Sequence, residues 1–60
     1  MIYENYRGHR IFMNKYGSGW QAMIRPPNSE IPIPGPFSED PTNYKSVLVE
    51  AKQWIDQGKI

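Results

Sequence analysis

The chain has 60 residues, a net charge of +1 and no cysteine. Its length leaves room for one small domain over residues 1–60, and the missing cysteines exclude disulfides and thiolate metal sites. It shows neither a signal peptide nor an apolar stretch of the ~20 residues that a membrane span needs, so we expect a soluble, cytoplasmic protein.

The charge is unevenly distributed along the chain. Residues 1–28 have a net charge of +3, whereas residues 29–60 have a net charge of −2. A basic half beside an acidic half attracts polyanions or a second copy of the same chain.

The first eight residues give a weak structural signal. Ile2, Tyr3 and Tyr6 predict either a short strand or a flap. Gly8 allows a bend or a bulge before the next element.

Two runs that are rich in apolar residues, 9–15 and 20–25, predict a β-hairpin. Gly17-Ser18 suits a two-residue type II′ turn, because glycine readily adopts the positive φ that its first central position requires. A three-residue loop over residues 17–19 is the alternative, and it would change the pairing of the strands.

The two-residue turn determines which side chains of the hairpin share a face. One face is apolar and is expected to join the core; it carries Ile11, Met13, Trp20, Ala22 and Ile24. On the other face, Arg10 lies across from Arg25, and Phe12 lies across from Met23. Because like charges directly opposite are destabilising, these four residues predict a binding site for a protein partner, a second copy or a nucleic acid. The alternative is a solvated face on which Glu4 or Glu30 neutralises the arginines.

Residues 31–36 read Ile-Pro-Ile-Pro-Gly-Pro. In an extended chain, alternate residues point their backbone groups to opposite edges, so Pro32, Pro34 and Pro36 would all lack an N–H on one edge. Ile31 and Ile33 would share one face. This pattern predicts the last strand of a sheet with its outer edge blocked, and a polyproline-like loop is the alternative.

An amphipathic helix is predicted over residues 41–57. Its apolar residues recur at helical spacing: Tyr44, Val47, Leu48, Ala51, Trp54 and Ile55. Asp40 before Pro41 is the expected N-cap, with Thr42 as a second candidate, and Gly58 is expected to end the helix.

Reactive groups do not converge anywhere in the sequence. His9 is the only histidine, and no carboxylate or thiol accompanies it in sequence. We therefore expect no enzymatic activity, no metal, no cofactor and no small-molecule substrate. The aromatic residues Trp20, Tyr44 and Trp54 are interpreted as core residues.

Two families resemble parts of this pattern. The strand at residues 19–24, the proline-rich segment ending at Gly35 and the helix containing Ala51 resemble HicB-type antitoxins. This resemblance implies a partial double-stranded-RNA-binding fold that holds a toxin. The glycine that precedes Trp20 on a strand and the C-terminal helix are also similar to the arm-type DNA-binding domains of tyrosine integrases, which implies a DNA partner.

The predicted fold is α+β: a three-stranded antiparallel sheet of β-β-β-α order, with the helix packed on one face. The predicted function is that of a non-enzymatic binding or accessory module acting through protein–protein contact or self-association. A small nucleic-acid-binding module that uses the hairpin face with Arg10, Phe12, Met23 and Arg25 is the alternative.

Overall fold

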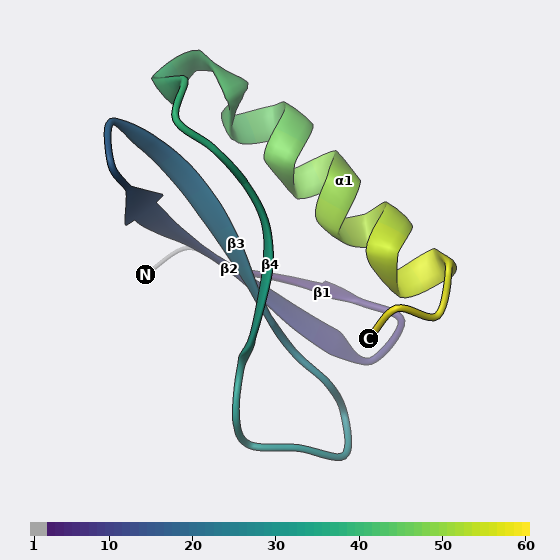
Figure 1. The fold of residues 1–60 in the computed structure, drawn as a ribbon. Coiled ribbons are helices and arrows are strands. Elements are labelled where there is room, and N and C mark those ends of the chain that lie inside the picture. Colours follow the sequence, from purple (N-terminus) through teal and green to yellow (C-terminus); the bar gives the residue numbers. More distant parts are fainter. Residues whose placement is uncertain (1–2) are drawn as a thin grey trace.

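The computed structural model describes residues 3–60 as an antiparallel sheet with one helix lying across it (Figure 1). The sheet has the order β1-β2-β3-β4, from β1 (Tyr3–Tyr6), β2 (His9–Tyr16), β3 (Gly19–Arg25) and β4 (Ile33–Ser38). A 3₁₀ turn, η1 (Pro41–Asn43), leads into the helix α1 (Tyr44–Asp56). The predicted α+β class, antiparallel sheet and C-terminal helix are confirmed. The sheet has four strands instead of three, because the segment that was left open between a strand and a flap forms β1; Ile2 of that prediction lies outside the described residues.

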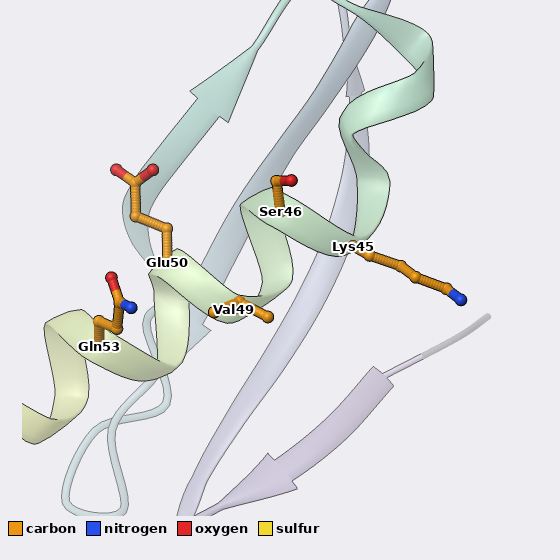
Figure 2. Close-up of a pocket in the computed structure, with 5 residues that line it drawn as sticks. All are labelled: Lys45, Ser46, Val49, Glu50 and Gln53. Carbon is orange, nitrogen blue, oxygen red and sulfur yellow. The ribbon is translucent and has the colours of Figure 1, made fainter.

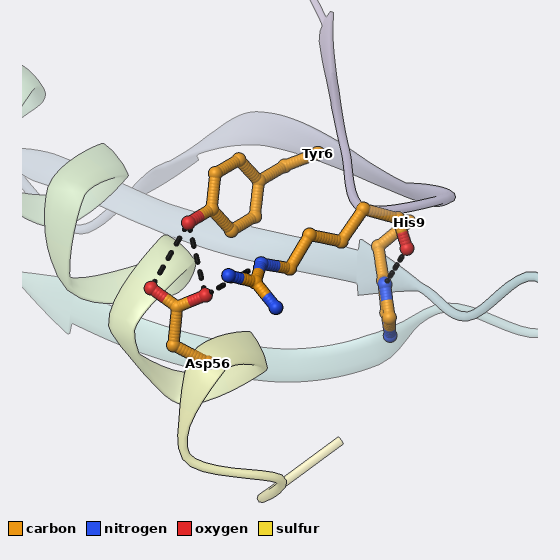
Figure 3. Close-up of polar contacts among 4 residues, drawn as sticks. Tyr6, His9 and Asp56 are labelled. Atoms are coloured by element: carbon orange, nitrogen blue, oxygen red, sulfur yellow. Dashed lines mark hydrogen bonds and ion pairs between the residues drawn. The ribbon is translucent and has the colours of Figure 1, made fainter.

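The turn between β1 and β2 is made by Arg7 and Gly8. Both have positive φ, +50° and +79°, as a two-residue type I′ turn requires. This conformation costs a non-glycine residue about 1–2 kcal/mol. Asp56, at the end of α1, holds the turn in place: its carboxylate accepts a hydrogen bond from Tyr6 Oη at 2.9 Å and pairs with Arg7 Nε at 2.9 Å (Figure 3).

The β2–β3 hairpin has the predicted two-residue turn at Gly17-Ser18. Gly17 has φ +57°, and Tyr16 pairs with Gly19 directly beyond the turn. The predicted pairs of Ile11 with Ile24 and of Met13 with Ala22 are therefore confirmed.

The core lies between the hairpin and α1. Ile11, Ala22 and Ile24 are fully buried on the sheet, and they form one cluster with Val47, Ala51 and Ile55 of the helix. Every third or fourth helical residue thus faces the sheet, as the predicted amphipathic pattern requires.

The aromatic residues do not form the centre of this core, and that prediction is wrong. Trp20, Tyr44 and Trp54 are each half-buried at its margin. Trp20 packs edge-on against Tyr44, with ring centroids 5.0 Å apart, and its indole N–H donates to the carbonyl of Pro41 at 3.2 Å. This margin suits the indole, because its polar edge keeps a hydrogen-bond partner while its ring remains in apolar contact.

The pairing of β3 with β4 contains a bulge, in which Ala22 faces both Gly35 and Pro36. The extra residue reverses the alternation of β4, so Pro36 does not share an edge with Pro34, and Pro32 precedes the strand. The prediction of one edge lined by three prolines is therefore wrong. A bulge is a place where a strand tolerates proline, because the regular ladder is interrupted there.

The segment is a strand and not a polyproline-like loop, but it begins two residues later than predicted, at Ile33. Ile31 and Ile33 are exposed and form no part of the core. Gly35 is buried instead, and a Cβ at this position would lie 2.8 Å from the carbonyl oxygen of Ala22. Only glycine therefore allows β4 to lie this close to β3.

Both ends of the helical segment have the predicted caps. The Asp40 carboxylate accepts hydrogen bonds from the backbone N–H of Thr42 at 2.9 Å and from its hydroxyl at 2.7 Å, and these bonds lower the pKa of Asp40. At the other end, Gly58 has φ +74°, and the N–H of Lys59 donates to the carbonyl of Trp54. This is the Schellman arrangement that ends many helices at a glycine.

Among residues 3–60, no helix has the length and hydrophobicity needed to cross a membrane.

Candidate binding face

The sheet has one face covered by α1 and one face that no helix covers, which we call the open face. Successive strand residues point to opposite faces, so the neighbours of the buried residues in β2 and β3 point away from the helix. The strand residues of the open face are Tyr3, Asn5, Arg10, Phe12, Asn14, Tyr16, Gln21, Met23, Arg25, Pro34 and Phe37.

The four predicted site residues lie together on the two inner strands of this face, toward the end of the hairpin that lies opposite its turn. Arg10 pairs with Arg25, and Phe12 pairs with Met23, as the predicted register requires. Phe12 and Met23 line a hollow of about 210 Å³ together with Asn14 and Pro32, which comes from the loop before β4. All four site residues are half-buried, so neighbouring side chains hold them in place while part of each stays accessible.

The two arginines have no acidic partner among residues 3–60. Glu4, the only acidic residue in the four strands, pairs with Lys52 of α1 on the covered face. The other ion pair joins Arg7 to Asp56. No ion pair in the described part of the chain includes Arg10, Arg25 or Glu30, so neither Glu4 nor Glu30 neutralises the two arginines.

Arg10 is held by an aromatic ring instead of a carboxylate. Its guanidinium carbon lies 4.5 Å from the centre of the Tyr3 ring, which is a cation–π distance. Its Nε is buried and has no hydrogen-bond partner within residues 3–60. This Nε is therefore an unsatisfied donor in the described part of the chain.

Sequence reasoning missed three aromatic residues of the open face, Tyr3, Tyr16 and Phe37, all of which are exposed. Tyr16 and Phe37 pack with ring centroids 4.5 Å apart. They meet across the start of β3, where Gly19, the partner of Tyr16, has no side chain to separate them. Tyr16 follows from the confirmed register by simple alternation. Phe37 does not, because it was expected beyond the end of the last strand.

A second hollow, of about 340 Å³, lies on the outer face of α1 and is lined by Lys45, Ser46, Val49, Glu50 and Gln53. Figure 2 shows that Lys45, the one cationic side chain of this lining, extends away from Glu50, so the opposite charges do not converge. A ligand site needs convergent polar groups, and this surface lacks them. The open face of the sheet is therefore the better candidate.

The reactive side chains are used within the fold. The Nδ1 of His9 donates to the carbonyl oxygen of Arg7 at 3.0 Å, and Figure 3 shows this ring apart from the Asp56 carboxylate. The part of the chain that the structure describes contains no cluster of three or more histidine, aspartate or glutamate residues that could hold a metal ion.

Comparison of the chain with protein-family models, with curated proteins and with solved structures found no significant match. The resemblances to HicB-type antitoxins and to integrase arm-type domains therefore stay predictions. The case for a function rests on the geometry of the open face.

Proposed function

We propose that this protein is a non-enzymatic binding module whose contact surface is the open face of its sheet. The observation that carries the proposal is the pairing of Arg10 with Arg25 at the end of the hairpin strands, without an acidic partner, beside the apolar pair of Phe12 and Met23. Two like charges directly opposite one another on a sheet oppose folding. A partner that brings negative charge to this face would remove that cost.

The same charges bear on the choice of partner. A symmetric dimer buries the same patch on both copies, so a dimer through this face would bring four arginines together. The strand residues of the face include no carboxylate to offset them. Charge complementarity therefore favours an anionic partner over a second copy of the chain.

Site-specific photo-crosslinking in the host cell tests the proposal. A photoreactive phenylalanine analogue replaces Phe37 on the open face in one variant and Val49 on the outer face of α1 in the control. The two positions are matched, because Phe37 is 56% exposed and Val49 is 53% exposed. We expect discrete covalent adducts from position 37 that are absent from position 49. Equal adduct formation at both positions, or adducts from the helix alone, would contradict the proposal.

A further inference from the structure

The exposed aromatic rings of the open face form two groups. Tyr3 and Phe12 make one group, with ring centroids 6.0 Å apart, and Tyr16 and Phe37 make the other. Phe12 and Tyr16 are both on β2, four residues apart, so the groups are separated by about 13 Å along the strand. This span corresponds to about four nucleotides at the ~3.4 Å rise of a stacked strand, and to fewer when the strand is extended.

The space between the two groups is polar. Asn14 pairs with Gln21 there, and each amide offers both a donor and an acceptor, as base edges and the ribose 2′-hydroxyl require. Arg10 and Arg25 lie to one side of the Phe12–Met23 pair and carry the positive charge that phosphate groups need.

The apolar part of the face consists mostly of aromatic rings. Its strand positions hold aromatic residues, Met23 and Pro34, but no leucine, isoleucine or valine. Aromatic rings spaced along a basic sheet surface are the means by which proteins stack unpaired bases, and such sheets hold two or three bases at once. A duplex does not offer its bases for stacking, which restricts the ligand to single strands.

From this arrangement we infer that the open face binds single-stranded RNA. Bases stack on the rings of Tyr16, Phe37 and the Tyr3–Phe12 group, and the arginines contact phosphates. The inference rests on the proposed function, because it uses the same face and names its anionic partner. The central amides favour RNA over DNA, since the 2′-hydroxyl gives them an additional group that both donates and accepts.

Fluorescence anisotropy with the full chain tests the inference. The probes are a fluorescein-labelled RNA of about eight nucleotides without self-complementarity, the DNA of the same sequence and an RNA duplex of about 16 base pairs, each titrated between about 50 and 200 mM salt. We expect the single-stranded RNA to bind more tightly than the other two. Its binding should weaken with salt by about 0.7 in the log–log slope for each phosphate contact.

Two pairs of variants locate the binding. Phe37→Leu keeps an apolar side chain but loses the ring, so it should weaken binding by roughly 5- to 100-fold, whereas Val49→Ala on the helix should not. The Arg10→Ala and Arg25→Ala double variant should lower the salt slope by about 1.4, whereas the equally charged Lys45→Ala and Lys59→Ala control should leave it nearly unchanged. Circular dichroism checks that each variant is folded. If the arginine double variant does not fold, the Phe37→Leu variant still tests the inference, because Phe37 is exposed and its ring is not part of the core.

Several results would overturn the inference. The first two are an affinity for the RNA duplex, or for the DNA strand, that equals the affinity for single-stranded RNA. The others are no binding of the single-stranded RNA at about 50 mM salt, and wild-type affinity for it in Phe37→Leu. Photo-crosslinking at position 37 separates this failure from failure of the proposed function. Adducts there that resist ribonuclease, together with absent RNA binding, would overturn the RNA assignment and leave the open face as a contact surface for an anionic protein.

Discussion

Replacing Ile24 with alanine is expected to leave the protein largely unfolded. Ile24 is fully buried between β2, β4 and the helix, and it is one of only six buried residues in the core cluster. Truncation of a buried isoleucine to alanine costs about 2–5 kcal/mol, because apolar contact is lost and a cavity remains. A 60-residue domain has a total free energy of unfolding of about 3–9 kcal/mol, so this one change removes much of it.

The matched comparison is Trp54→Ala. The larger side chain would normally cost more, and the sequence pattern placed it in the core. Trp54 is only half-buried, however, and its ring is covered by the Lys59 side chain, whose Nζ lies 5.4 Å from the ring centre. We therefore expect a cost of about 2 kcal/mol, because most of the residue's surface is removed from water on folding but no enclosed cavity is left at the margin of the core.

Urea denaturation followed by far-ultraviolet circular dichroism measures both variants without relying on tryptophan fluorescence. With a denaturant slope of about 1 kcal/mol per molar urea, Ile24→Ala should lower the midpoint by about 2 M or abolish the folded baseline. The midpoint of Trp54→Ala should fall by less than that of Ile24→Ala. A larger loss in Trp54→Ala than in Ile24→Ala would refute this assignment of the core.

Two further predictions concern the backbone and pH. Gly19→Ala should destabilise the domain by at least about 1–3 kcal/mol, because a Cβ at this position overlaps the backbone of Ser38, and thermal unfolding would show a lower Tm. A Tm equal to that of the wild type would mean that β4 does not approach β3 as described. The lowered pKa of Asp40 means that its charged form stabilises the folded state above about pH 4, and that this contribution is lost as the pH falls through the folded-state pKa. Asp40→Asn does not titrate, so its stability difference from the wild type should be present near neutral pH and shrink toward acid pH; a pH-independent difference would contradict this role.

The elements that local sequence determines were predictable. The β2–β3 register follows from Gly17-Ser18 and from the alternation on either side, both of which involve neighbouring residues. The helix follows from its 3.6-residue apolar period and from caps at Asp40 and Gly58 that lie next to it in the chain. The same register grouped Arg10 with Arg25 on the open face.

The remaining features depend on contacts between distant residues. β1 has four residues, and its sequence shows no clear alternation of apolar and polar residues. The turn after it places Arg7 in a left-handed conformation, which Asp56, near the other end of the chain, helps to hold. The bulge in β4 lies where the backbone of Gly35 comes close to Ala22 on β3, and no local sequence pattern indicates it. These two strands supply Tyr3 and Phe37, and for that reason the place of these two rings on the open face could not be predicted from the sequence.

Methyl NMR of the two hairpin methionines tests the role of the open face most directly. Met23 lies on that face beside Phe12, whereas Met13 lies on the covered face and packs against the core, so each serves as the other's control. In protein with ¹³C-labelled methionine methyl groups, assigned with Met→Leu variants, the single-stranded RNA octamer is added in steps. The Met23 methyl resonance should shift progressively, because stacked bases bring ring currents to the open face, and the Met13 resonance should stay in place. A shift of Met13 with an unmoved Met23, or no shift of either at saturating RNA, would contradict binding at this face.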